Sequence, residues 1–429
     1  MRLTGRFLLL IAALSALGTA TTAPAKPATA KPSAEWREVF QSSPSLSEPF
    51  SEEFIKRIVE EYKIPAAMLE PMRPKPPVTG TLRFRFAVAS GGTQLRIRIS
   101  NENGAAPLVL AAASVGFAAD GYNATPGSLK SLTFGGARSV SIAAGAPILS
   151  DPVDMTVSAL AELVVSAQFP TGLTFDPRGG SVMAMASGDQ TMSPSLEGQT
   201  TIRGRPFVSG AAVLTGKPPR LIVALGDSIT DGNRDKPGAL RSWPEQLNRR
   251  LAARKNGPAY AVINAGISGN RVLTRSWGEA ALARLDRDVL RIEGVTHVVM
   301  LEGTNDIGMS GKSLFGDNPV VTADELIAGY RQIIARTHAR KIKVVMGTIL
   351  PTGGAMSHHS PAKEAVRQTV NTWIRTSGEP DRVIDFDQIT RDPSDPIKMR
   401  KDVDSGDHLH PGEAGYRIMG DAIDLSVFN

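Results

Sequence analysis

A serine, a histidine and an aspartate occupy positions in this sequence from which they could carry out acyl transfer. Ser228 follows the apolar run LIVAL (221–225) in the segment LIVALGDSITDG, and Asp407 and His410 stand in DHLH near the C-terminus. A serine hydroxyl is a weak nucleophile and needs a neighbouring base to take its proton. A histidine base in turn needs an acidic partner that fixes its tautomer and stabilises the imidazolium. These residue types therefore fit a nucleophile, a base and an orienting acid.

Two further polar, glycine-rich segments could supply the donors that a tetrahedral oxyanion needs. NAGISGN (264–270) and EGTNDIG (302–308) each follow an apolar run. We take the backbone N–H groups of Ser228 and Gly269, and the side-chain amide of Asn305, as the candidate oxyanion donors. Donors aimed in advance at such an oxyanion are worth roughly 3–4 kcal/mol each.

The order of apolar runs and helical patterns after residue 220 predicts the sheet that must position these residues. Helical patterns separate five apolar runs: 221–225, 260–264, 296–301, 342–350 and 382–386. Such alternation is typical of a parallel sheet with helices on both sides. Ligands of these folds bind outside the carboxyl ends of the strands, where the polar segments lie. Two of the helices begin with the spacing of a capping box, at Ser242 with Glu245 and at Thr322 with Glu325.

Four short motifs in this half of the chain resemble the sequence blocks of the SGNH (GDSL) hydrolases. They are GDS after the first strand, the glycine of NAGISGN, GTND after the third strand, and D-x-x-H near the C-terminus. The resemblance covers roughly residues 221–429, about half of the chain. It implies that Ser228 is the nucleophile, that His410 is the general base and that Asp407 orients it.

The same resemblance implies a set of oxyanion donors, a fold and an activity. Gly269 and Asn305 become oxyanion donors beside the amide of Ser228. The fold is expected to be a flavodoxin-like three-layer α/β/α domain that needs no metal or other cofactor. The activity is expected to be cleavage of esters of sugars, lipids or small alcohols.

In the first half of the chain, apolar residues recur with a different period, at every second position. From 81 to about 213, apolar and polar residues alternate in short runs such as TLRFRFAV and LRIRI, with clusters of Gly, Pro, Asn and Asp between them. This pattern is typical of a β-sandwich, most similar to a jelly roll. The segments RIRISNENGAAPL and SLTFGGARSVSIAAGAPILSDPV also resemble the N-terminal sandwich of some secreted bacterial SGNH hydrolases.

The patterns predict four successive segments. They are a signal peptide at 1–25, a linker with a short helix at 26–80, a β-sandwich domain at 81–216 and an SGNH hydrolase domain at 217–429. The signal peptide is indicated by basic MRLTGR, apolar FLLLIAALSALG and the small residues of TATTAPA. The apolar run is too short to span a bilayer comfortably. We expect export to the periplasm or the extracellular space without stable membrane insertion after signal removal; an uncleaved anchor is the alternative.

Composition excludes several other kinds of site. The chain has no cysteine, which excludes disulfides, thiolate metal sites and a cysteine nucleophile. The net charge of +6 is spread along the sequence, and no dense basic run suggests nucleic-acid binding. His358 and His359 could suggest a metal pair, but adjacent histidines point in different directions and no third ligand lies near them in sequence. We therefore expect no metal site.

Neighbouring residues offer alternative assignments of the catalytic roles. His408 competes with His410 as the base, and Asp404 competes with Asp407 as the acid. The spacing of three residues from Asp407, and the Pro-Gly that follows, favour His410. Asp227, directly before the serine, is expected to shape the turn.

The sequence thus predicts an exported serine esterase that hydrolyses carboxylic esters through an acyl-enzyme. Its leading substrate is an O-acetyl group of a carbohydrate, whether a small molecule or a polysaccharide. A lipase or a broad short-chain carboxylesterase is the close alternative. A catalytically inactive polysaccharide-binding protein is the alternative of another class, and the four retained residue types argue against it.

Overall fold

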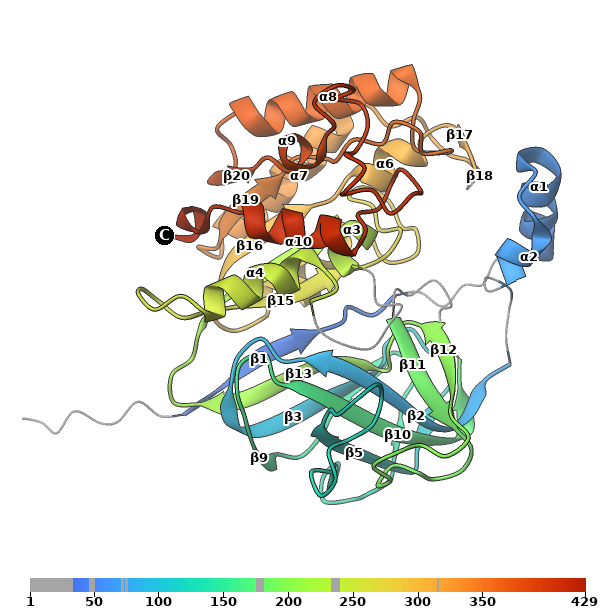
Figure 1. The fold of residues 1–429 in the computed structure, drawn as a ribbon, viewed down its shortest axis with the longest axis vertical. Coiled ribbons are helices and arrows are strands. Elements are labelled where there is room, and N and C mark those ends of the chain that lie inside the picture. The colour runs from blue at the N-terminus through green and yellow to red at the C-terminus, as the bar shows by residue number, and fades with distance from the viewer. Residues whose placement is uncertain are drawn as a thin grey trace, which may run out of the picture. The chain divides into compact units, whose positions relative to one another are not determined.

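A computed structural model describes residues 34–45, 51–70, 73, 76–174, 181–232, 240–314 and 316–429 of the chain (Figure 1). The predicted signal peptide at 1–25 lies outside the described residues. Within these ranges, no helix has both the length and the apolar character that crossing a membrane requires.

The C-terminal part of the chain contains a five-stranded parallel sheet (Figure 1). Its strands, in sheet order, are β15 (Tyr260–Gly266), β14 (Arg220–Gly226), β16 (Val295–Leu301), β19 (Lys343–Gly347) and β20 (Arg382–Ile384). Numbered along the chain this order is 2-1-3-4-5, which is the flavodoxin-like arrangement. The predicted parallel sheet is therefore confirmed, and Ser228 follows the strand at which the order reverses.

Helices cover both faces of this sheet. Leu221, Val223 and Leu225 of β14 pack in one hydrophobic cluster, whereas Ile222 and Ala224 pack in another. The first cluster includes residues of α5 (Ala281–Leu285), α7 (Ala323–His338) and α8 (Pro361–Thr376). The second includes residues of α4 (Trp243–Ala252), α9 (Phe386–Thr390), α10 (Glu413–Ala422) and the final turn η3 (Leu425–Phe428). This alternation along a buried strand produces the three layers.

Shorter elements lie in the connections between the strands of the parallel sheet. They are α3 (Ser228–Asp231), η2 (Asp286–Leu290), α6 (Thr304–Gly308), β17 (Lys312–Ser313) and β18 (Gly316–Asp317). Two of them, α3 and α6, begin directly after β14 and β16 and carry candidate site residues.

The part of the chain before residue 217 is rich in antiparallel strands, and we call it the strand-rich region. One sheet has the order β1 (Glu35–Gln41), β13 (Val208–Thr215), β3 (Gly92–Asn101) and β8 (Ala146–Leu149), with β9 (Val153–Val157) also on β3. A second has the order β12 (Thr200–Gly204), β11 (Ser181–Ala186), β2 (Val78–Ala87), β10 (Glu162–Leu173), β5 (Ala112–Phe117) and β6 (Lys130–Ser131). A small pair joins β4 (Leu108–Leu110) to β7 (Val140–Ile142). Side chains of both larger sheets, such as Phe84 and Ile97, share one hydrophobic cluster.

The structure differs from the expected linker at 26–80. Strand β1 lies within it and pairs antiparallel with β13, and Val39 and Phe40 are buried in the cluster of the strand-rich region. The run EWREVFQ is short, and its partner strand lies far along the chain, so its local pattern did not reveal a strand. The predicted short helix is α1 (Glu52–Tyr62), which Ser51 caps and α2 (Ala66–Leu69) follows.

Candidate active site

Ser228 is held in a tight turn between β14 and α3. It is the first residue of α3, and the buried side chain of Asp227 caps this helix by accepting a hydrogen bond from the backbone N–H of Ile229, at 2.9 Å. Gly226 ends the strand, where an added Cβ would lie 2.1 Å from Oγ1 of Thr230. Burial raises the pKa of Asp227 to about 7. Asp227 therefore shapes the turn, in the role expected from the sequence.

A continuous chain of hydrogen bonds joins Ser228 to Asp407. Ser228 Oγ lies 2.8 Å from His410 Nε2, and His410 Nδ1 lies 2.6 Å from a carboxylate oxygen of Asp407. A carboxylate partner at Nδ1 requires the proton there, so Nε2 is free to accept the serine proton. The structure thus brings these three predicted residues together in the order that nucleophilic catalysis needs.

The carboxylate of Asp407 is held in its charged form. Its Oδ1 accepts the backbone N–H groups of Leu409, at 2.9 Å, and of His410, at 2.8 Å. Partial burial acts to raise the pKa of Asp407, but the His410 contact and these two backbone donors together hold that pKa well below its usual range.

The alternative pair forms a separate contact. His408 Nδ1 lies 2.6 Å from Asp404, and the backbone of His408 has a positive φ of 62°. The ring of His408 lies beside Gly354, where an added Cβ would be 3.0 Å from it. Ser228 is therefore hydrogen-bonded to His410, while His408 and Asp404 pair with each other.

The two further candidate oxyanion donors lie on a loop and a short helix that contact each other. Gly269 has a φ of +72°, and an added Cβ would lie 2.5 Å from the ring of Trp277, so the position favours glycine on both counts. Asn305 lies on α6, and its Nδ2 donates to the backbone carbonyl of Asn270 at 3.0 Å. This bond fixes the side-chain amide of Asn305 next to the loop that contains Gly269.

His358 orients the amide of Asn305, a role that the sequence analysis missed. Its Nε2 lies 3.1 Å from Asn305 Oδ1, and its Nδ1 lies 2.8 Å from Ser357 Oγ. Burial lowers the pKa of His358 to about 3, so the ring is neutral and carries one proton. Because an amide oxygen can only accept, that proton is on Nε2. No local motif marks this role, since His358 reaches the site from the loop after β19.

We expect substitution of His358 by leucine to lower kcat by roughly tenfold, a smaller loss than the 10²–10³ for removing a donor outright. Without the imidazole, the amide of Asn305 loses the contact that fixes which of its atoms faces the site. The substitution H358Q keeps a donor and should retain more activity than H358L. Kinetics on p-nitrophenyl acetate provide the measurement, and equal activity of H358L and wild type would contradict this role.

Arg284 donates hydrogen bonds to the ends of two strands beneath the site, β14 and β15. This fully buried side chain donates to the carbonyl of Gly226 at 3.0 Å and to that of Ala265 at 2.6 Å. It also donates to the side chain of Asn270, at 2.8 Å. Arg284 belongs to none of the motifs found in the sequence, and only the fold reveals its position.

The described residues contain no group of three or more His, Cys, Asp or Glu side chains arranged to hold a metal ion. His358, one member of the histidine pair, is instead committed to Asn305 and Ser357.

Residues 224–418 match the family model of the GDSL-like lipase/acylhydrolase family. No curated protein matches the chain. Among solved structures, a putative lipolytic protein of the G-D-S-L family from Desulfitobacterium hafniense is similar at 19% identity and a TM-score of 0.36, covering 47% of this chain and 96% of that protein. A GDSL-like lipase from Bacteroides thetaiotaomicron is similar at 20% identity and a TM-score of 0.37, and the match covers 49% of this chain and 91% of that protein. A mutant of an acetyl-xylooligosaccharide esterase from Geobacillus Stearmophilus is similar at 23% identity and a TM-score of 0.37, and the match covers 48% of this chain and 94% of that protein.

Proposed function

Residues 224–418 belong to the GDSL-like lipase/acylhydrolase family, and we propose that the chain hydrolyses carboxylic esters through an acyl-enzyme formed on Ser228. Membership makes the chain a hydrolase that acts on ester bonds. The observation that supports this route is the unbroken hydrogen-bond chain from Ser228 through His410 to Asp407.

The proposed reaction has two matching halves. Ser228 Oγ attacks the ester carbonyl carbon while His410 Nε2 takes its proton, and Asp407 stabilises the imidazolium. The oxyanion forms against the backbone N–H groups of Ser228 and Gly269 and the amide of Asn305. The C–O bond to the alcohol then breaks, and His410 gives the proton to the leaving oxygen. Water, activated by the same histidine, releases the acid and restores Ser228.

The proposed substrate is an O-acetylated carbohydrate outside the cytoplasm. Two features support it: the signal-like sequence at 1–25, and the strand-rich region, which we interpret as a β-sandwich domain because its two larger sheets share one hydrophobic cluster. The link from a sandwich to a carbohydrate is an analogy between folds and does not follow from the chemistry of the site.

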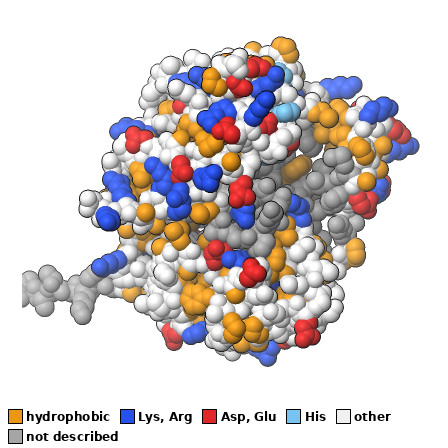
Figure 2. Space-filling model, viewed as in Figure 1, with side chains coloured by type: hydrophobic (Ala, Val, Ile, Leu, Met, Phe, Trp, Pro, Cys, Tyr) orange, Lys and Arg blue, Asp and Glu red, His pale blue; other side chains and the backbone are white. Residues whose placement is uncertain are grey.

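We also propose that nucleic acid is not a partner. Figure 2 shows Lys and Arg side chains interspersed with Asp and Glu on this face of the molecule. The ion pairs of the structure agree, since many surface arginines are matched by carboxylates, as in Arg331 with Glu379. A nucleic-acid site would instead need a basic stripe free of such partners.

Acetate release from acetylated polysaccharides, measured beside hydrolysis of p-nitrophenyl esters of increasing chain length, tests this substrate. We expect release of acetate and a preference for the acetyl ester, both abolished in S228A. Activity confined to p-nitrophenyl esters would indicate a general esterase, and a preference for long chains a lipase. No hydrolysis of any ester, with retention of the chain on polysaccharide, would favour the binding protein.

A further inference from the structure

One arginine of the strand-rich region reaches the elements that carry the candidate nucleophile and an oxyanion donor. Arg205 lies between β12 and β13, and its side chain is 8% exposed. Its Nη1 donates to Asp231 at 2.9 Å, and its Nη2 donates to the carbonyl of Gly266 at 2.8 Å. Its Nε is held by the carbonyl of Ser43 at 2.7 Å. The guanidinium thus joins the strand-rich region to the ends of α3 and β15.

Both contacts lead directly to the site. Asp231 is the last residue of α3, the short helix that Ser228 begins. The same carboxylate oxygen of Asp231 accepts a hydrogen bond from Ser268 Oγ at 3.1 Å, and Ser268 immediately precedes Gly269. A single carboxylate, fixed by Arg205, therefore connects the nucleophile helix with the loop of the second candidate donor.

The packing at this point leaves little room for adjustment. An added Cβ on Gly266 would lie 2.3 Å from the backbone nitrogen of Asp231, so β15 and α3 already touch through their backbones. The side chain of Asp231 is 6% exposed, and the ion pair with Arg205 is shielded from solvent. An arginine that donates two hydrogen bonds away from solvent fixes the relative positions of its acceptors and also neutralises the charge of a carboxylate among them.

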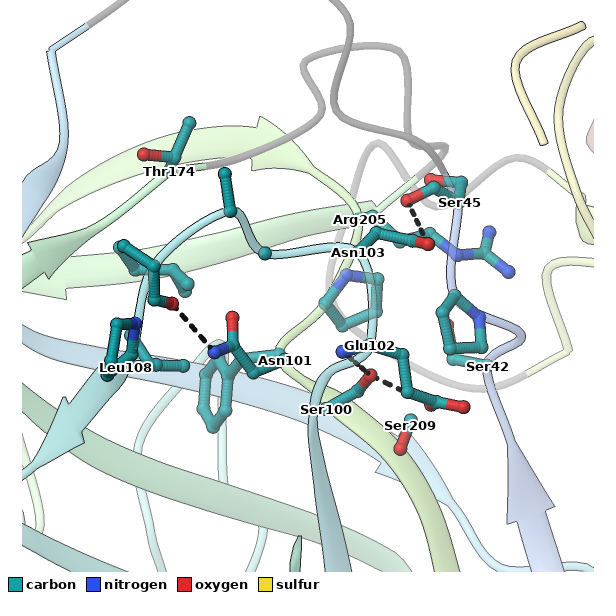
Figure 3. Close-up of a pocket in the computed structure, with 18 of the residues that line it drawn as sticks. Ser42, Ser45, Ser100, Asn101, Glu102, Asn103, Leu108, Thr174, Arg205 and Ser209 are labelled. Carbon is teal, nitrogen blue, oxygen red and sulfur yellow. Dashed lines mark hydrogen bonds between the residues drawn. The ribbon is translucent and has the colours of Figure 1, made fainter. Parts of the chain in front are cut away.

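The other side of Arg205 belongs to the strand-rich region. It lines a cavity of about 300 Å³ together with residues that include Ser42 and Asn101 (Figure 3). In that view the guanidinium points away from Asn101. The charged group is thus directed toward Asp231 and Gly266, the partners that its hydrogen bonds identify.

We propose that Arg205 is a positioning residue for ester hydrolysis, through which the strand-rich region sets the relative placement of Ser228 and Gly269. This inference rests on the proposed function of the site. It gives the strand-rich region a role in turnover that does not depend on binding substrate.

The test uses the full chain and separates positioning from stability. Active sites are first counted by covalent titration of Ser228 with a phosphonate, and kcat and KM for p-nitrophenyl acetate are then given per titrated site. R205K keeps the charge but loses the planar fork, and we expect kcat to fall about 10- to 100-fold with KM little changed. S268A removes one hydrogen bond to Asp231 and should lower kcat by about tenfold or less.

The matched control is R37M. Arg37 also joins the strand-rich region to the hydrolase part, through Glu293 at 3.4 Å, but this contact precedes the amino end of β16, whereas the site lies at the carboxyl ends of the strands. We expect the melting temperature of R37M to change and the kcat of R37M per titrated site to stay at the wild-type value. In R205K combined with S268A, the loss should be smaller than the product of the single losses, because both act through Asp231.

The outcomes separate a failure of the positioning role of Arg205 from a failure of the proposed ester hydrolysis. A lowered kcat in R205K and S268A, with wild-type kcat in R37M, supports positioning. Wild-type kcat per site in R205K and S268A, even with a lower melting temperature, would overturn it and leave Arg205 as a structural contact. If R205K does not fold, S268A alone decides. A wild-type chain that hydrolyses no ester would overturn the proposed function itself.

Discussion

Substitution of Ser228 by alanine should reduce kcat/KM for p-nitrophenyl acetate by roughly 10⁴- to 10⁶-fold, because no acyl-enzyme can form. The loss should fall on kcat, since the hydroxyl contributes little to holding the substrate. Some activity above the uncatalysed rate should remain, because the oxyanion donors are still present. The measurement is steady-state hydrolysis with the uncatalysed rate subtracted.

The control for S228A is another serine-to-alanine change on the same chain. Ser394 lies in an exposed turn, where its hydroxyl donates to Asp392 at 2.7 Å, and S394A should keep wild-type kcat and KM. Ser228 is only half-buried, and alanine is smaller, so the melting temperature of S228A should stay near that of wild type. Substantial activity in a folded S228A would mean that another group attacks the ester.

The parallel sheet could be predicted because its signals are local and repeated. Most of its strands contain an uninterrupted apolar run, such as Leu221–Leu225 of β14 and Val298–Leu301 of β16, as expected for strands buried on both faces. Helix starts were less predictable. Thr322 and Glu325 form the expected capping box, but Ser242 and Glu245 do not, because Glu245 instead accepts the backbone N–H of Arg241 at 2.5 Å.

The strand-rich region was harder to predict in detail, because its contacts join segments far apart in the sequence. Arg83 alternates with apolar residues in the run TLRFRFAV, yet its side chain is fully buried. It donates to Ser166 at 2.7 Å and to the carbonyl of Pro194 at 2.8 Å, and burial lowers its pKa to about 10. Alternation reveals which residues share a face, but it cannot reveal that loops cover the outer face.

The same distinction holds at the site. Ser228, Asn305 and His410 could be proposed because each stands in a recognisable motif. His358 and Arg205 could not, because their partners lie 53 and 26 residues away in sequence and the contacts follow no fixed spacing. Residues that react with substrate are revealed by motifs, whereas those that hold them in place are revealed only by the fold.

Substitution of Asp407 by asparagine should lower kcat by about 10⁴-fold, with the geometry of the site retained. An amide at this position can donate to His410 Nδ1, which favours the tautomer whose Nε2 carries the proton and cannot accept one from Ser228. The pKa of Asp407 lies well below its usual range, so the side chain that asparagine replaces is a charged carboxylate at neutral pH. Steady-state hydrolysis of p-nitrophenyl acetate provides the measurement.

The neighbouring acid provides the matched control for this prediction. Asp404 holds His408 at the same distance at which Asp407 holds His410, 2.6 Å in each pair. Both carboxylates also accept backbone N–H groups of their own loop, so D404N disturbs the loop in a comparable way. We expect D404N to retain most of the wild-type activity. The reverse result, a large loss in D404N with a mild effect in D407N, would transfer the orienting role to Asp404, because only the acid that fixes the tautomer of the working imidazole governs kcat.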